Sequence, residues 1–257
     1  MGLTGARPHA PSAAEREVAW HDLECGGYTE DLPLWRELAA SRADGPVARV
    51  LELGAGTGRV SLDLARAGHE VTALEISPAL LGALRERARG LPLRAVAGDA
   101  RRFELGVRFD VCLVPMQTLQ LLDGAGERGE LLAAAGAHLR PGGLFACAIV
   151  TAPDSFDARS GPAPEPERMT RDGFLYESRP LAVRPGPRTI RIERERVVTD
   201  GAGAPAAPPE HDVVVLAQLT ARQLWAEGGS AGLRPAPSAE IAETEEHSGS
   251  EVVMLDA

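Results

Sequence analysis

The sequence predicts an α/β fold in which helices cover both faces of a parallel sheet. Short apolar strand patterns alternate with helical patterns over residues 49–150, and strands separated by helices pair in parallel. The first of these strands runs straight into a glycine-rich turn at residues 54–58, and open α/β sheets bind ligands at this end of their strands. A length of 257 residues fits one large domain, or one and a half.

The N-terminal part of the chain has a lead-in followed by helical patterns. Residues 1–14 are a Pro/Ala-rich lead-in without the long apolar stretch of a signal peptide. Two helical patterns follow, separated by a break at residues 25–27, and the second tolerates a proline in its first turn. We therefore expect an N-terminal helical cap over residues 15–45.

The central part of the chain carries the alternating pattern. Ser77 and Pro78 mark a helix start, as an N-cap followed by a proline at the first helical position. Two further helical stretches precede the turn at residues 140–143. Strands are predicted at residues 50–53, 70–76, 93–97, 109–114 and 144–150, with helices at 59–67 and 77–89, which makes residues 46–150 a ligand-binding core.

The last third of the chain changes character. Proline and glycine punctuate residues 151–187, which predicts a loop or lid with only short order. Residues 189–198 and 212–219 are predicted to form an antiparallel hairpin, because apolar and charged residues alternate in the first of them. Thr220 caps a helix that runs to about Glu227, and the last strands are expected at 233–241 and 251–255. This gives a lid and hairpin insertion over residues 151–219 and a C-terminal completion of the core sheet over residues 220–257.

The composition excludes several chemistries. All 27 basic residues are arginine, and the chain has neither lysine nor asparagine, a bias that we attribute to a GC-rich bacterial genome. Without lysine there is no Schiff-base enzyme and no P-loop. Three cysteines without paired spacing give neither a disulfide framework nor a zinc site. A net charge of −10 disfavours binding to a nucleic-acid backbone, and no apolar run is long enough for a membrane helix, so we expect a cytoplasmic protein.

The glycine-rich turn has the spacing G-x-G-x-G and follows an acid, Glu52. This differs from the G-x-G-x-x-G of dinucleotide folds, and the charge of Glu52 would oppose a pyrophosphate but suits a ligand with ammonium and sulfonium groups. Glu75 ends the second strand, where a carboxylate can accept hydrogen bonds from both ribose hydroxyls. Asp99 follows the third strand, where it can meet an adenine amino group. Three ligand groups at three successive strand ends predict a nucleoside-containing cofactor.

With these motifs the sequence resembles the class I S-adenosylmethionine (SAM)-dependent methyltransferases of small-molecule type, with a domain similar to methyltransferase domain 25. The resemblance rests on residues 50–59, Glu75, residues 98–100 and residues 139–143. It implies a Rossmann-like, seven-stranded, mostly parallel sheet with a reversed last strand, an N-terminal helical cap and an inserted antiparallel hairpin lid. The hairpin resembles, more weakly, the lid of N-methyltransferases that act on glycine or amino sugars.

The resemblance also implies a cofactor site, with SAM as the cofactor and S-adenosylhomocysteine as its product. Gly54, Gly56 and Gly58 would line the methionine part, Glu75 the ribose, and Asp99 with Ala100 the adenine. Further cofactor contacts are expected from the remaining residues of these motifs and of the cap: Tyr28, Glu52, Ala55, Arg59, Ile76, Arg101, Val114 and Pro115.

Three residues are candidates for a catalytic role. Tyr28 matches a tyrosine that closes over the methionine end of the cofactor in similar enzymes. His21 in the cap and Gln117 after the fourth strand could reach the reacting atoms. A lone histidine is more often a surface or packed residue, and Gln117 and Gln120 could equally be solvated helix-cap residues. Two further histidines, His69 and His138, are expected at the surface.

The expected function is SAM-dependent methyl transfer to an N- or O-nucleophile of a small molecule, in bacterial secondary metabolism. No metal is expected, because the Asp/Asp/Asn magnesium site of catechol-type enzymes needs an asparagine that this chain lacks. Neither nucleic acid nor membrane is an expected partner, and a homodimer stays open. The alternatives are a protein or nucleic-acid methyltransferase and a non-methylating SAM-dependent cyclase or decarboxylase.

Overall fold

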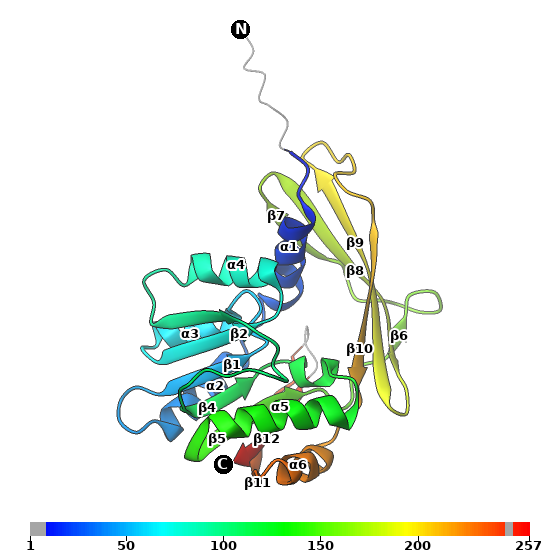
Figure 1. Cartoon of the computed structure of the whole chain (residues 1–257). Coiled ribbons are helices and arrows are strands. Elements are labelled where there is room, and N and C mark those ends of the chain that lie inside the picture. Colours follow the sequence, from blue (N-terminus) through cyan, green and yellow to red (C-terminus); the bar gives the residue numbers. More distant parts are fainter. Residues whose placement is uncertain (1–8, 245–248) are drawn as a thin grey trace.

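The computed structural model describes residues 9–244 and 249–257 (Figure 1). Its larger sheet has seven strands in the order β11-β12-β5-β4-β1-β2-β3. Strands β1 to β5 are parallel, and β12 runs antiparallel to its neighbours β5 and β11. The predicted fold class, with its reversed last strand, is confirmed. The strands are β1 (Arg49–Leu53), β2 (Glu70–Glu75), β3 (Leu93–Ala97), β4 (Phe109–Val114), β5 (Leu139–Ile149), β11 (Arg234–Ile241) and β12 (Ser250–Asp256).

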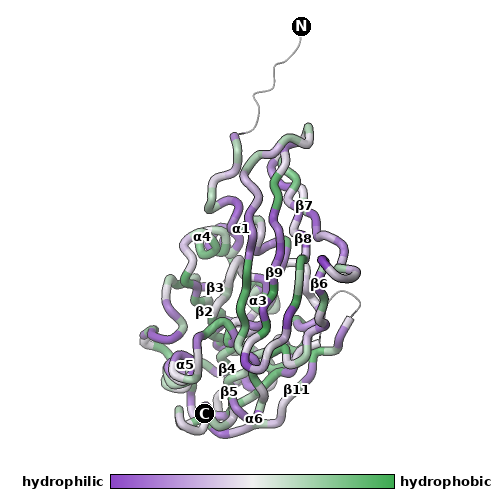
Figure 2. The backbone as a smooth tube through the Cα atoms, turned by 90° about the vertical axis from the view of Figure 1, so that its right-hand side faces the viewer, coloured by the Kyte–Doolittle hydropathy of each residue, from purple (hydrophilic) through white to green (hydrophobic). Residues whose placement is uncertain are grey.

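Helices cover both faces of this core sheet. On one face α2 (Leu32–Arg42), α3 (Arg59–Arg66) and α4 (Pro78–Arg87) pack against alternate strand residues such as Val50 and Ala73. On the other face α5 (Gly124–His138) and α6 (Ala221–Ser230) pack against residues such as Leu51. Both faces are therefore buried, and every residue of β4 is buried, as expected for a central parallel strand. Figure 2 shows hydrophobic segments among these central strands.

The helix starts follow the predicted local chemistry. The Ser77 hydroxyl accepts from the backbone N–H of Leu80 at 3.3 Å, with Pro78 in the first turn of α4. Thr220 begins α6 with a capping box, in which its hydroxyl accepts from the Gln223 N–H and the Gln223 side chain accepts from the Thr220 N–H. These two helices begin where the sequence places them.

A second, antiparallel sheet stands beside the carboxyl edge of the core sheet (Figure 1), and we call it the lid sheet. The predicted hairpin is present as β9 and β10, but the prediction of a loop over residues 151–187 is wrong, because this segment supplies three strands. Pro180 lies where the pairing of β8 with β9 shifts register, and Pro185 ends β8, so neither proline interrupts a regular ladder. The strands are β6 (Phe156–Asp157), β7 (Glu167–Arg171), β8 (Phe174–Pro185), β9 (Thr189–Asp200) and β10 (Glu210–Ala217).

Helix α1 (Ala13–Cys25) lies between the two sheets, in contact with α4 on one side and with β7 and β8 on the other (Figure 1). A capping box of Ser12 and Glu15 begins it. The short helix η1 (Thr118–Leu121) follows β4 and contacts both β5 and β10. These two short elements join the core to the lid sheet.

Two histidines expected at the surface are buried instead. His69 Nδ1 accepts from the Ala48 N–H at 3.1 Å, and His138 Nε2 accepts from the Leu105 N–H at 3.1 Å. Since Nε2 of His138 accepts, its Nδ1 carries the proton and donates to the carbonyl of Ala134 at 2.8 Å. Both rings satisfy backbone groups far from the carboxyl edge, so the surface prediction is corrected to a structural role.

Among the described residues, no helix combines the length and the apolar character needed to cross a membrane.

Candidate cofactor and acceptor site

The glycine-rich turn between β1 and α3 adopts backbone angles that require glycine. Gly54, Gly56 and Gly58 have φ values of 73°, 56° and 98°, in the left-handed region that L side chains rarely adopt. A Cβ on Gly56 would lie 2.2 Å from Nε2 of His21, and one on Gly54 would lie 2.4 Å from Cγ2 of Thr118. The turn therefore lies tightly between α1 and η1, with its backbone at the carboxyl edge of the sheet.

Glu75 ties this turn to the end of β2. Its Oε2 accepts from the Gly56 N–H at 2.7 Å and its Oε1 accepts from the Ser77 N–H at 2.8 Å. Each oxygen keeps a second acceptor position. The neighbouring Ile76 side chain is 66% exposed, although it is a large apolar group. A carboxylate with free acceptor capacity beside an exposed apolar surface fits the ribose and base of an adenosine.

The residues after β3 form a charged cluster. Both carboxylate oxygens of Asp99 accept from the Arg101 guanidinium, with the closest contact at 2.6 Å, and this pairing lowers the pKa of Asp99 to about 2. Arg101 also forms an ion pair with Glu127 at the start of α5. Ala100, between Asp99 and Arg101 in the sequence, is partly buried. Asp99 thus lies at the predicted strand end with its oxygens directed to Arg101, and its role toward adenine stays a proposal.

Glu52 lies beneath the turn rather than on its surface. Its side chain is buried and accepts from the Ser61 hydroxyl of α3. Burial raises the pKa of Glu52 to about 7, against the opposing effects of Ser61 and Arg59. Ala55 is buried in the same turn, packed with Leu62 of α3. Glu52 therefore supports the turn from the interior.

Arg59 begins α3 and binds the cap. Its guanidinium forms an ion pair with the buried Asp31, in which Nη2 donates to Oδ2 at 2.8 Å, and Nη1 donates to the carbonyl of Tyr28 at 2.8 Å. The Tyr28 ring lies 5.3 Å from the guanidinium carbon. Burial, with Asp31 and Glu30 nearby, raises the pKa of Tyr28 to about 12, so its hydroxyl keeps its proton at neutral pH. Arg59 positions Tyr28 at the edge of the site.

His21 covers the glycine turn. Its ring packs on Gly56, and its Nδ1 lies 3.3 Å from the Thr57 hydroxyl. Burial lowers the pKa of His21, more strongly than the nearby Asp22 and Glu75 raise it. The neutral ring is the favoured form, and it contacts the turn from α1.

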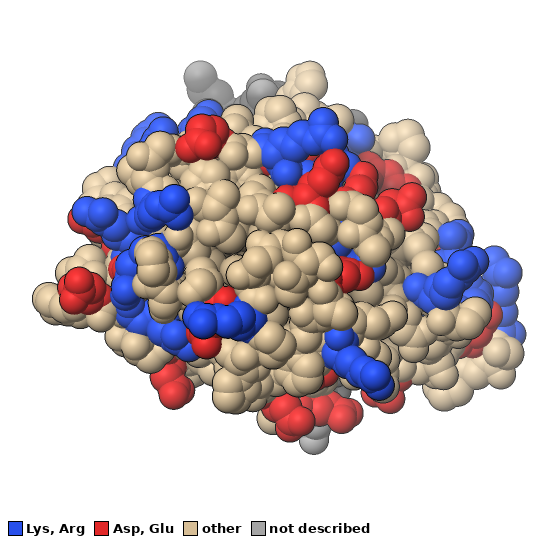
Figure 3. Space-filling model, turned by 60° about the horizontal axis from the view of Figure 1, so that its bottom comes forward, with Lys and Arg blue, Asp and Glu red and all other residues tan. Residues whose placement is uncertain are grey.

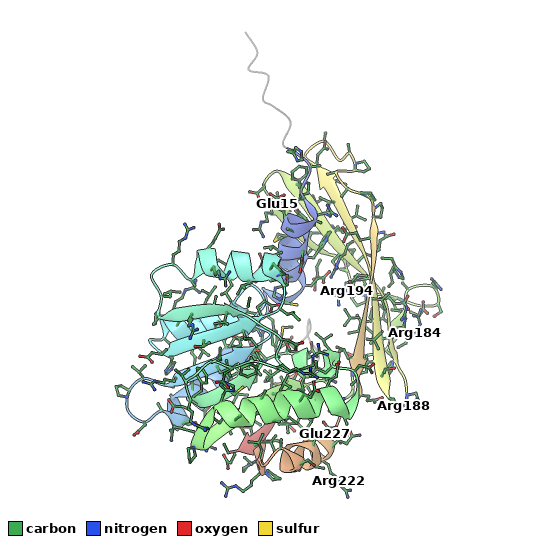
Figure 4. The ribbon with its side chains drawn as sticks, in the orientation of Figure 1. Glu15, Arg184, Arg188, Arg194, Arg222 and Glu227 are labelled. Atoms are coloured by element: carbon green, nitrogen blue, oxygen red, sulfur yellow. The ribbon has the colours of Figure 1, made fainter. Side chains whose placement is uncertain are left out.

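A cavity of about 900 Å³ lies between the core and the lid sheet, and we call it the acceptor cavity. Tyr28, Met116 and Gln117 line it on the core side, and Ser178 lines it from the lid. Arg194 projects from β9 on the side of the lid sheet that faces the core (Figure 4). The apolar wall comes from both sheets: Val150, Phe156, Val183, Ile192, Leu216 and Ile241.

The segment after β4 turns sharply toward this cavity. Val114 and Pro115 are buried, whereas Met116 and Gln117 line the cavity. Met116 has a φ of 54°, which costs about 1–3 kcal/mol in a residue other than glycine. Such strain is common where a backbone is shaped for a ligand. Met116 was not among the predicted site residues, although its neighbours Val114, Pro115 and Gln117 were, and its place after the fourth strand was the available signal.

Gln120 contacts neither solvent nor the acceptor cavity. Its Oε1 accepts from the Val150 N–H at 2.8 Å, and its Nε2 donates to the carbonyls of Val150 and Ala217. The side chain is buried and joins the end of β5 to the end of β10. The prediction of a solvated or substrate-facing Gln120 is therefore wrong.

Among residues 9–244 and 249–257, no group of three or more His, Cys, Asp and Glu side chains is arranged to hold a metal ion.

Comparisons with known proteins agree with this geometry. Residues 50–143 match the family model of a methyltransferase domain. The chain is 36% identical over 114 residues to the cypemycin N-terminal methyltransferase of a Streptomyces species, a match that covers 44% of this chain and 46% of that protein. The chain thus spans less than half of this curated relative.

Solved structures match over nearly the whole chain. The SAM-bound amino pentose methyltransferase CalS10 of Micromonospora echinaspora has a TM-score of 0.67 at 24% identity, covering 93% of this chain and 95% of that one. The glycopeptide N-methyltransferase MtfA, complexed with SAM, has a TM-score of 0.59 at 25% identity, covering 87% and 86%. Residues 50–143 therefore form a methyltransferase domain, and the chain has the fold of SAM-dependent methyltransferases.

Proposed function

We propose that this protein transfers the methyl group of SAM to a small molecule bound in the acceptor cavity, by metal-free in-line displacement. The observation that carries the proposal is that the acceptor cavity and the glycine turn lie at the same edge of the core sheet. Tyr28, Met116 and Gln117 line the acceptor cavity at the carboxyl edge of the core sheet, where the glycine turn also lies. A cofactor on the turn and an acceptor in the cavity would meet at these residues.

The protein itself has mainly to bind and position the two reactants. Bound SAM supplies a methyl group already activated by its sulfonium. The glycine turn, Glu75 and Ile76 bind and orient the cofactor, and the apolar wall of the cavity excludes water. Tyr28 donates and Gln117 donates or accepts hydrogen bonds to hold the acceptor in line, a positioning task that can supply several kcal/mol of a barrier. His21 stays a candidate for a catalytic role, on the side of the glycine turn that would hold the cofactor.

The charge of the cavity favours a nitrogen nucleophile. Of the residues that the structure describes, seven acidic ones line it, against a single arginine, Arg194. Glu24, Asp31 and Glu193 have arginine partners, but Asp154, Glu165 and Glu243 at the mouth form no ion pair with the described residues. A negative potential there attracts a protonated amine. The amino pentose, glycopeptide N- and N-terminal methyltransferases among its relatives support the same acceptor class.

The dimensions favour a small molecule over a macromolecule. About 900 Å³ is within the usual size of small-ligand pockets. The net charge of −10 opposes a nucleic-acid acceptor, and on the face shown in Figure 3 arginines are interspersed with acidic side chains rather than gathered into a basic stripe. These features favour a small metabolite.

The test is transfer of labelled methyl from SAM to a panel of amino sugars, short peptides with free N-termini and phenols, with and without EDTA. Labelled amines in the presence of EDTA are expected. Loss of labelling on chelation would contradict the metal-free reaction, and labelling of phenols alone would contradict the amine acceptor. SAM binding without any labelled product would favour a non-methylating member of the fold.

Charge neutralisation gives a sharper test of the amine acceptor. The triple variant Asp154→Asn, Glu165→Gln, Glu243→Gln should raise the acceptor KM about tenfold at low salt, and less at high salt, because the potential at the mouth is lost. The control is Glu37→Gln, Glu86→Gln, Glu240→Gln, which removes the same charge from exposed positions outside the cavity. Equal effects of the two triples would show that net charge alone matters.

A further inference from the structure

We infer that Asp22 is a positioning residue that couples the two halves of the site: it transmits occupancy of the glycine turn to the lid sheet. The inference rests on the proposed function, because it assumes a cofactor on the turn and an acceptor under the lid. It is argued from the contacts of α1 on its two sides and from the place of Asp22 between them.

Toward the core, α1 covers the cofactor half. The Ser77 hydroxyl, directly after Glu75 and Ile76, donates to Glu17 at 2.5 Å. One turn later, the ring of His21 packs on Gly56. A ligand seated on the glycine turn must therefore displace α1 or lie against it.

Toward the lid, the same helix holds β7, β8 and β9. The ring of Trp20 packs edge-on against Tyr176, with ring centres 5.0 Å apart. Glu24 accepts from the Ser178 hydroxyl at 2.8 Å and from Arg196 at 2.6 Å. These contacts join α1 to the lid but not to the core, just as Glu17 joins it to the core but not to the lid.

Asp22 binds both sides at once. Its Oδ1 accepts from the Thr57 hydroxyl of the glycine turn at 2.7 Å and from Arg87 of α4 at 2.8 Å. Its Oδ2 accepts from Arg87 at 2.5 Å and from Arg171 of β7 at 2.9 Å. The side chain is only 16% exposed, so these bonds are shielded from solvent. A shift of the Thr57 and Arg87 side of this carboxylate must change the geometry of Arg171.

The lid side of this connection reaches the acceptor cavity within one hairpin. Arg171 ends β7, and β8 begins at Phe174 after a tight turn. Ser178, Pro180 and Val183 of β8 line the cavity. Fixing Arg171 therefore fixes the strand that forms one wall of the cavity, so a cofactor held under α1 should pre-organise the cavity for the acceptor.

Hydrogen exchange with S-adenosylhomocysteine as the probe tests the coupling without an acceptor. In the wild type, S-adenosylhomocysteine should slow amide exchange in residues 167–178 severalfold. Arg171→Met should bind S-adenosylhomocysteine with a Kd within about threefold of wild type, yet lose the slowing in the lid, since Arg171 joins Asp22 to the lid sheet and takes no part in the Asp22 contacts with Thr57 and Arg87. Arg87→Met should instead raise the Kd about tenfold or more, because it loosens α1 over the turn.

The matched control is Arg168→Met. Arg168 lies on the same strand as Arg171 but pairs with Glu177 on the lid sheet itself, so its variant should respond to S-adenosylhomocysteine like the wild type. The inference is overturned if Arg171→Met keeps the wild-type slowing or if Arg168→Met also loses it. Asp22→Asn should combine both defects, and the arginine variants carry the test even if it folds poorly. Absence of S-adenosylhomocysteine binding to the wild type would count against the proposed function instead.

Discussion

The cofactor half and the acceptor half of the site are built in opposite ways. The cofactor half uses backbone and short side chains at the ends of consecutive parallel strands, so that Gly56 and Glu75 meet through one hydrogen bond. The acceptor half gathers side chains from the cap, the core edge and the lid, so that Tyr28, Gln117 and Ile192 share one cavity. The first half follows from the local sequence at the ends of neighbouring strands, and the second exists only after long-range packing.

The lid sheet itself shows how the second half separates cavity from solvent. On its inner side Val183, Ile192 and Leu216 line the cavity. On its other side, charged pairs such as Arg168–Glu177 and Arg179–Glu195 cross between strands. An antiparallel sheet with one covered face and one charged, solvent-facing side needs a partner on one side only.

The largest expected effect is on the cofactor half. Glu75→Ala should raise the SAM Kd about 10³-fold, because each hydrogen bond to a charged group contributes about 1.5–3 kcal/mol and two hydroxyl partners are lost. Glu70→Ala, at the exposed other end of the same strand, should leave the Kd unchanged. Isothermal calorimetry measures both, and unchanged affinity in Glu75→Ala would remove Glu75 from the cofactor site.

The next effect probes the contact between the cap and the turn. Gly56→Ala should destabilise the fold by roughly 2–4 kcal/mol and weaken SAM binding, because its φ is strained and its Cβ would meet His21. Adding His21→Ala should recover the part due to the contact. Gly68→Ala shares the positive φ but has open space around its Cβ, so it reports the backbone cost alone. Thermal denaturation of the four proteins separates the terms, and equal losses in Gly56→Ala and Gly68→Ala would mean that α1 does not press on the turn.

The same contrast explains what the sequence could predict. The core strands, the caps at Ser77 and Thr220, and the carboxyl-edge positions of the turn and Glu75 follow from local periodicity and turn chemistry, and the structure has them. Strand β8 was missed because Pro180 and Pro185 resemble loop residues, while the register shift that accommodates Pro180 depends on its pairing with β9.

Contacts between residues far apart in the sequence could not be predicted, for the same reason. Asp22 binds Arg87 and Arg171, which are 65 and 149 positions away. Gln120 is recruited by the ends of β5 and β10. The buried rings of His69 and His138 accept hydrogen bonds from backbone N–H groups that only the assembled fold brings to them. A polar residue in a helix or turn looks solvated until the element that covers it is known.

A pH experiment tests whether Glu52 belongs to the interior of the cofactor half. Because the pKa of Glu52 is raised to about 7 in the folded chain, the native state holds a proton that the unfolded chain releases at an ordinary carboxyl pKa. Stability from this group is therefore complete below the unfolded pKa and is lost as the pH rises toward 7. Between pH 5 and 7 the wild type should lose roughly 2 kcal/mol more than Glu52→Gln, which cannot ionise. Urea unfolding at both pH values measures the difference, and parallel curves for the two proteins would place Glu52 in contact with solvent.

The smallest expected effect sharpens the acceptor half. Ile192→Val should raise the KM of a labelled amine two- to fivefold, because this change removes one carbon from the cavity wall and each such apolar group contributes about 0.8 kcal/mol. Its SAM Kd should stay unchanged, since Ile192 lines the cavity and not the glycine turn. Val215→Ala, at an exposed position of β10 in the same sheet, is the control and should leave KM as it is. A change in SAM affinity without a change in KM would assign the inner face of the lid to the cofactor half, and the division between the two halves would then have to be drawn elsewhere.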